Sequence, residues 1–167
     1  MRYHNVTKAD MLNGDGLRVV LWVSGCSHHC KNCHNPITWN KDDGLEFTEE
    51  TWLEIKNELQ QDYCNGITFS GGDPLEPYNF DTVYDIICRI RREFGWTKTI
   101  WVYTGYTLEE LYAQSRYIPL LHQIDILVDG EFQEEKKNPS LKFRGSENQR
   151  IIKIQDSLSR QEVVLYE

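Results

Sequence analysis

The stretch SGCSHHCKNCHNP, at residues 24–36, concentrates side chains that bind metals or act as nucleophiles. It holds three cysteines, Cys26, Cys30 and Cys33. Where thiols are kept reduced, as in the cytosol, a close group of cysteines indicates a metal site or catalysis rather than a disulfide. The spacing, with three and then two residues between the cysteines, allows three thiolates to surround one centre within a single loop.

Three kinds of site fit this loop, and the loop alone leaves them open. A structural zinc ion would take the three cysteines and one histidine as a closed tetrahedral set. A nucleophilic cysteine needs a partner base, and the spacing singles out no Cys–His pair. A [4Fe–4S] cluster normally takes four cysteines, so three would leave one iron able to coordinate a substrate or cofactor. Among the histidines, we expect His28 and His29 to be solvated and His34 to contact the bound group.

A glycine-rich turn follows the next apolar run, in TFSGGDPLEP. Gly71 and Gly72 lack Cβ atoms, so they allow a ligand to approach the backbone closely or the chain to adopt a positive φ. Asp73 can accept hydrogen bonds from a cationic amine. Turns of this composition are common, but this one comes one strand–helix unit after the cysteine loop. Its position therefore predicts a ligand contact on the same side of the fold.

The elements that must position these residues alternate between strands and helices. Continuous apolar runs rich in β-branched residues predict buried strands, at residues 17–23, 66–70, 98–103 and 124–129. Between them, Thr48 can cap one helix, a second has apolar residues at helical spacing over 79–94, and Thr107 with Glu110 forms a capping box for a third. This alternation predicts an α/β fold with a mostly parallel sheet.

The chain is too short for a closed eight-unit barrel, which typically needs about 250 residues. We expect an open sheet or a partial (β/α) barrel, with the reacting groups beyond the carboxyl ends of the strands. The third and fourth runs end in YTGY, at residues 103–106, and VDG, at residues 128–130, so polar or glycine residues stand at that edge as well. Residues 133–148 are polar and predict a long loop, and RIIKI and EVVLY near the end predict a C-terminal β-hairpin.

Length and composition predict one soluble domain over residues 1–167, with 40% hydrophobic and 26% charged residues. The net charge of −8 disfavours nucleic acid and membrane surfaces as partners, because both bind basic patches. No apolar run approaches the roughly 20 residues of a membrane span, and the first residues do not resemble a signal peptide. The expected compartment is the cytoplasm, and we assign no function to Cys64 or Cys88.

Taken together, these motifs resemble the radical S-adenosylmethionine superfamily, in which a Cys-x3-Cys-x2-Cys loop follows the first strand and a Gly-Gly-acidic turn follows the second. More narrowly, the chain is similar to the activating enzymes of anaerobic (class III) ribonucleotide reductase. The blocks that carry this resemblance include NGDGLRVVLWVSGC, SGGDPLEP, WVYTGY, ILVDGEF and FRGSENQR. Only the last seventeen residues, from Ile151, lie outside it.

The resemblance implies an oxidoreductase with a radical-SAM fold. Cys26, Cys30 and Cys33 would hold a [4Fe–4S] cluster, and S-adenosylmethionine would bind its fourth iron. Implied cofactor contacts are Asn32, His34, Gly71, Gly72, Asp73, Thr104 and Asp129, and no residue of the chain is assigned as acid, base or nucleophile. An electron from a low-potential donor would cleave the cofactor to a 5′-deoxyadenosyl radical. That radical would take hydrogen from a glycine near the C-terminus of the reductase large subunit.

Two other functions compete with this interpretation. The first is a superfamily enzyme that acts on a small purine-like molecule, against which the motif blocks after Asp129 argue. The second, from another class, is a zinc-stabilised interaction module without catalysis. Such a module would be colourless and would need zinc to fold.

Overall fold

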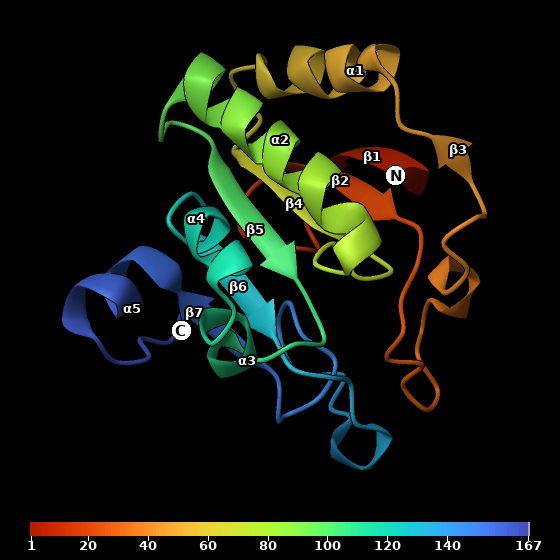
Figure 1. Cartoon of the computed structure of the whole chain (residues 1–167), viewed down its shortest axis with the longest axis vertical. Coiled ribbons are helices and arrows are strands. Elements are labelled where there is room, and N and C mark those ends of the chain that lie inside the picture. Colours follow the sequence, from red (N-terminus) through yellow and green to blue (C-terminus); the bar gives the residue numbers. More distant parts are fainter. Residues whose placement is uncertain (167) are drawn as a thin grey trace.

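Residues 1–166, which the computed structural model describes, form an open seven-stranded sheet flanked by helices (Figure 1). Its strands are β1 (Arg2–Asp10), β2 (Arg18–Val23), β3 (Leu45–Glu46), β4 (Gly66–Gly71), β5 (Thr99–Tyr103), β6 (Ile126–Asp129) and β7 (Arg150–Lys153). The order across the sheet is β3-β1-β2-β4-β5-β6-β7. The central strands β2, β4, β5 and β6 run parallel, whereas β1, β3 and β7 pair antiparallel at the edges. Glu167, the last residue of the predicted domain, lies outside the described residues.

The four predicted strands are the four central ones, and their runs of buried residues confirm that both faces of the sheet are covered there. Side chains alternate between two clusters. Val19, Leu21 and Val23 pack in the larger cluster under the helices, while Trp101 and Val128 belong to a second cluster on the opposite face. In the described part of the chain, one face of the sheet is therefore covered by helices and the other is not.

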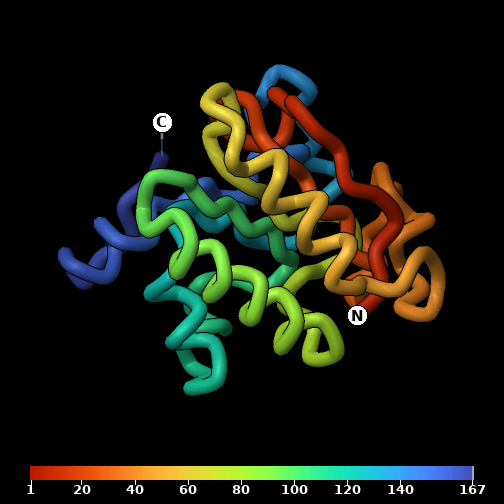
Figure 2. Tube along the Cα trace, turned by 90° about the horizontal axis from the view of Figure 1, so that it is seen from above, coloured from red at the N-terminus to blue at the C-terminus, as the bar shows by residue number. Residues whose placement is uncertain are grey.

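The helices are α1 (Glu49–Leu59), α2 (Pro77–Phe94), α3 (Leu108–Tyr112), α4 (Ile118–Leu121) and α5 (Ile154–Arg160). Helices α1 and α2 lie side by side on one face of the sheet, as Figures 1 and 2 both show. The predicted caps are confirmed: the Thr48 hydroxyl accepts from the Thr51 amide, and Thr107 with Glu110 forms a capping box. Among residues 1–166, no helix has both the length and the apolar character that crossing a membrane requires.

Strand β1 was not predicted, because its sequence RYHNVTKAD is mostly polar and buries little besides Tyr3. The strand forms because it pairs with β2, with Thr7 opposite Val20 and Asn5 opposite Trp22. This partner lies elsewhere in the sequence, so local periodicity carries no sign of the pairing. Strand β1 thus extends the sheet beyond β2.

The predicted C-terminal hairpin is wrong in its connection and in its second strand. The segment between the two apolar runs is helix α5, since Ile154, Ser157 and Leu158 fall on one helical face and the first two are buried there. The last residues do return antiparallel to β7, but only as an isolated bridge between Ile152 and Leu165. Residues 133–148 form turns with one short 3-10 turn, Glu134–Lys136, and so match the predicted loop.

Candidate functional site

The carboxyl ends of β2 and β4 lie side by side, which brings the cysteine loop against the glycine turn. Val23 is the register partner of Gly71, the last residue of β4. The loop closes on itself through the Gly25 amide, which donates to the Thr38 carbonyl at 2.6 Å. The Asp73 amide then donates to the Gly25 carbonyl at 2.8 Å. These backbone bonds seat the start of the loop directly on the turn.

The turn needs its two glycines for steric reasons. Gly71 has a φ of +104°, in the region that favours glycine. A Cβ on Gly72 would lie 2.3 Å from the Gly25 carbonyl oxygen, a distance at which atoms clash. The close approach of the two loops therefore depends on the absence of a side chain. The ligand contact that the sequence predicts at these glycines stays a prediction.

Asp73 is buried and its carboxylate connects three segments of the chain. One oxygen accepts from the Thr104 hydroxyl at 2.8 Å and the Gly105 amide at 2.9 Å, both at the end of β5. The same oxygen contacts the His28 ring at 2.9 Å, and the other accepts from the Leu75 amide at 2.8 Å. A carboxylate offers about four lone-pair sites. Three of the four protein contacts of Asp73 fall on Oδ2, whereas Oδ1 accepts one hydrogen bond and keeps a free lone pair.

His28 is not the solvated residue that the sequence predicted. Its ring lies between two carboxylates, with Nε2 at 2.9 Å from Asp73 and Nδ1 at 2.8 Å from Glu131. It also packs edge-on against Tyr106, with 4.7 Å between ring centroids. The hydrogen bond to Asp73 is the main reason that the pKa of His28 is raised to about 9. The local sequence could not show this environment, because both carboxylates come from other loops.

His29, by contrast, is exposed as predicted, and its ring stacks on Trp39.

Glu76 is a buried carboxylate that the sequence analysis did not single out. It accepts from the Ser27 amide at 2.7 Å and from the Ser27 hydroxyl, and so holds the loop between the first two cysteines. Its other oxygen accepts from the Tyr106 hydroxyl at 3.2 Å. The sequence sign that Glu76 belongs to the site is its position in the motif SGGDPLEP, just beyond the end of a predicted strand.

The segment after β6 closes over the cysteine loop from the other side. Glu131 reaches His28, and Glu134 lies 3.4 Å from the Lys31 ammonium. The Asn32 amide also donates to Glu134. Thus three strand ends, those of β4, β5 and β6, supply residues that hold this one loop.

The three cysteines are partly buried and carry no disulfide. Burial raises the pKa of the Cys26 thiol to about 12, and burial also raises the pKa of Cys30. The Cys33 sulfur accepts a hydrogen bond from the Asn35 amide at 3.4 Å. A metal must therefore displace the Cys26 proton when it binds, as metals do at thiolate sites.

Residues 12–152 match the family described as "4Fe-4S single cluster domain". An "anaerobic ribonucleoside-triphosphate reductase-activating protein" from Haemophilus influenzae is 43% identical over 153 residues, which cover 90% of this chain and 97% of its own. A protein of the same description from Escherichia coli K12 is 44% identical over 151 residues, covering 89% of this chain and 96% of its own. Another, from Enterobacteria phage T4, is 38% identical over 152 residues, covering 90% and 93%. The chain belongs to this family of activating proteins.

The donor set fits the iron–sulfur cluster of the matched family, because thiolates are the usual ligands of such clusters. A mononuclear zinc site fits less well. With Zn–S bonds of about 2.3 Å, tetrahedral geometry puts the sulfurs roughly 3.8 Å apart. Among residues 1–166, the three potential ligand atoms that lie within 4.8 Å of one another belong to Cys26, His28 and Glu76. The sulfurs of the three cysteines are not this close together.

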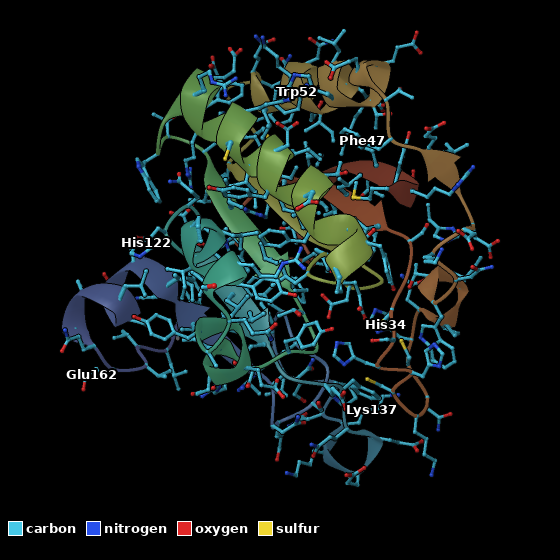
Figure 3. The ribbon with its side chains drawn as sticks, viewed as in Figure 1. His34, Phe47, Trp52, His122, Lys137 and Glu162 are labelled. Carbon is cyan, nitrogen blue, oxygen red and sulfur yellow. The ribbon has the colours of Figure 1, made fainter. Side chains whose placement is uncertain are left out.

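The other residues predicted to contact the cofactor lie in different environments in this family member. Thr104 joins the site through Asp73. Asp129 is buried, and its carboxylate accepts from Arg150 at the start of β7 and from the Leu108 amide at 2.8 Å. Asn32 is exposed and turned to Glu134. His34 is exposed, on the loop beyond the end of β2 (Figure 3). The cofactor roles of all these residues stay predictions.

Proposed function

We propose that this chain cleaves S-adenosylmethionine reductively at a [4Fe–4S] cluster and thereby generates a glycyl radical on the anaerobic ribonucleotide reductase. The observation that carries the proposal is the three-cysteine loop seated on the Gly71–Asp73 turn at the carboxyl ends of β2 and β4. The family membership supports the same activity. We also assign the open sheet to the radical-SAM type, as a partial (β/α) barrel, and treat residues 1–167 as one domain.

Cys26, Cys30 and Cys33 would hold the cluster, with one iron left without a protein ligand. When bound, the cluster would supply the electron that cleaves the sulfonium bond of the cofactor to give methionine and a 5′-deoxyadenosyl radical. The chain's own residues would bind and orient the cofactor and exclude water from it. Ser27, fixed by Glu76, and His28, fixed by Asp73, keep the loop in one conformation before the iron arrives. Such preorganisation lowers the entropic cost of binding.

The structure changes the role that we propose for Asp73. The sequence predicts that its carboxylate accepts hydrogen bonds from the cofactor amine, but the carboxylate is buried and three contacts within the protein already converge on Oδ2. We infer that the methionyl end meets the backbone of Gly71 and Gly72 instead. Asp73 then acts by holding the turn, the end of β5 and His28 together.

The partners proposed are the large subunit of the reductase, which offers the glycine, and a low-potential electron donor. Among residues 1–166, the helices pack on the other face of the sheet and none covers the second face near β1 and β2 (Figure 1). A loop of a larger protein could reach the cluster from that side. Because the hydrogen to be abstracted belongs to the partner, substrate specificity would rest on docking.

The decisive experiment uses chain purified without oxygen. We expect about four iron and four sulfide per chain, and a glycyl electron spin resonance doublet after incubation with reductase, reductant and S-adenosylmethionine. Cys30→Ala should lose both. Stoichiometric zinc without iron would support the interaction module instead, and an intact, reducible cluster that yields no glycyl signal would support a small-molecule substrate.

A further inference from the structure

A group of three potential metal ligands lies at the start of the cysteine loop, and only one of the three is a cysteine. One ligand atom each of Cys26, His28 and Glu76 lies within 4.8 Å of the other two. Tetrahedral bonds of a zinc ion to sulfur, nitrogen and oxygen put such atoms roughly 3.4–3.6 Å apart. The three side chains therefore need only short movements to bind one ion, and this ligand set differs from the three cysteines of the proposed cluster.

Glu76 is a buried carboxylate, and no salt bridge to it forms among residues 1–166. It is 3% exposed, and its contacts are neutral donors: the Ser27 amide and hydroxyl on Oε1 and the Tyr106 hydroxyl, at 3.2 Å, on Oε2. Although Glu76 directly precedes α2, its side chain makes no hydrogen bond that caps this helix. Buried carboxylates are usually paired with a cation or bound to a metal ion. Oε2, with one long hydrogen bond, keeps a lone pair for such an ion.

The His28 ring has the surroundings of a metal-binding histidine. Metal-bound histidines usually donate their other ring N–H to a carboxylate, which fixes the orientation of the ring. Both nitrogens of His28 have such a partner, with Nε2 at 2.9 Å from Asp73 and Nδ1 at 2.8 Å from Glu131. Whichever nitrogen binds the ion, the other keeps its carboxylate. Glu131 is the one that can move aside, because its side chain is 54% exposed and that of Asp73 is 1% exposed.

The mixed donor set selects the class of ion. Sulfur, imidazole and carboxylate together suit divalent ions of the first transition row, such as Zn²⁺ and Fe²⁺, whereas Mg²⁺ and Ca²⁺ prefer oxygen ligands alone. Three protein ligands leave a fourth position for water. Cys26 is partly exposed, so an ion can reach the three side chains from solvent.

We propose that the chain without its cluster binds one divalent ion of the first transition row through Cys26, His28 and Glu76. The ion displaces the proton of the Cys26 thiol, as metals do at thiolate sites. Because this site and the cluster of the proposed function share Cys26, one chain cannot hold both. This consequence rests on the proposed function: an ion such as Zn²⁺ at the mixed site keeps the cluster out.

The test is titration with Co²⁺, without oxygen, of the full chain freed of metal and with its thiols reduced. Co²⁺ is the probe because it binds at zinc-type sites and absorbs light strongly when a thiolate is among its ligands. We expect one Co²⁺ per chain, and Cys26→Ala should abolish the thiolate absorption. His28→Asn and Glu76→Gln should each weaken binding about ten-fold or more, since even the loss of a group that only orients a ligand costs about 10–100-fold.

Variants of the other two cysteines separate this site from one made by the cysteines alone. Cys30→Ala and Cys33→Ala should bind Co²⁺ as the natural chain does, and a clear loss of affinity in either would overturn the proposal. His29→Asn is the matched control, because His29 adjoins His28 in the sequence and its ring stacks on Trp39. Its affinity should equal that of the natural chain. Failure of the natural chain to bind one Co²⁺ would overturn the proposal as well.

A measurement on the natural chain keeps the test valid if the variants do not fold. X-ray absorption at the zinc edge of the Zn²⁺-loaded chain should show one sulfur ligand, with nitrogen and oxygen as the others. Three sulfur ligands around the ion would overturn the proposal.

Iron and sulfide analysis of a zinc-free portion of the same preparation, after cluster reconstitution, separates the two proposals. A cluster that forms in a chain whose Zn²⁺ has three sulfur ligands removes only the mixed site. One sulfur at the zinc, in a chain that forms no cluster, removes only the proposed function.

Discussion

The two ends of the parallel strands both bury charged side chains, but they use them in opposite ways. At the amino end, Arg18 is buried at the start of β2 and donates to the Ile67 and Thr99 carbonyls, each at 2.8 Å, and to the Thr68 hydroxyl at 2.9 Å. At the carboxyl end, Asp73 and Glu76 accept from loops that follow different strands. At the amino end a buried cation thus joins neighbouring strands, whereas at the carboxyl end buried anions join the loops that follow the strands.

The charged side chains at one end stabilise the sheet, whereas those at the other end hold the loops of the candidate site. Arg18 has neutral partners, and its guanidinium also lies over the Trp101 ring, 5.5 Å from the centroid. Burial lowers its pKa to about 10, so it stays charged at neutral pH. Its bonds join neighbouring strands and touch no loop of the site. The carboxylates instead hold loops whose geometry decides what can bind.

The largest effect on activity is expected at the cysteine loop. Cys26→Ala, Cys30→Ala or Cys33→Ala should each remove iron from the purified chain and abolish radical formation, because a cluster held by two thiolates is lost. Iron analysis and spin resonance measure this. Cys88→Ala, on α2, should keep both iron and activity. Full activity of any of the three loop variants would refute the assignment of the cluster ligands.

The largest effect on stability is expected at the opposite end. Arg18→Met keeps an apolar stem of similar length but leaves carbonyls and hydroxyls of β4 and β5 without a donor. We expect a loss of roughly 3 kcal/mol or more in the free energy of unfolding, measured by urea titration. Arg92→Met, at an exposed position of α2, should change it little.

Cluster content per folded chain should be unchanged in Arg18→Met, and a selective loss of iron there would erase the contrast between the two ends.

Substitution of Asp73 is expected to have a smaller effect, on both stability and cluster assembly. Asp73→Asn keeps the shape but turns one acceptor oxygen into a donor, which in either amide orientation faces a donor: the Leu75 amide, or the Thr104 hydroxyl and Gly105 amide. We expect a loss of about 1–3 kcal/mol in unfolding free energy together with slower cluster assembly, followed by absorbance during reconstitution. Asp62→Asn, at an exposed site, is the control. Unchanged assembly would mean that the turn does not organise the loop.

The smallest effect is expected at the Glu109–Arg150 pair on the surface beside β7. The hydrogen bond from Arg150 lowers the pKa of Glu109 below its ordinary value of 4.5. The pair therefore stabilises the fold above about that pH, and its contribution is lost as the pH falls through the lowered folded pKa. Glu109→Gln should cost less than about 1 kcal/mol at neutral pH. The difference from the natural chain should shrink in unfolding titrations carried to acid pH.

Much of this protein follows from local sequence. Apolar runs of β-branched residues determined the central strands, side-chain spacing and capping residues determined α1, α2 and α3, and the spacing of the cysteines determined the candidate cluster ligands. These features are local, because a few neighbouring side chains decide how one segment buries its apolar atoms.

Tertiary structure alone decided the rest. It paired the polar strand β1 with β2, placed Asp73 against Thr104 and His28, and joined Glu76 to Ser27. Each of these contacts joins residues far apart along the chain, and the environment of a buried polar group depends on all the segments that surround it. The spacing of residues in the sequence therefore identified the candidate metal ligands. Packing between distant segments determined which side chains can contact a bound group.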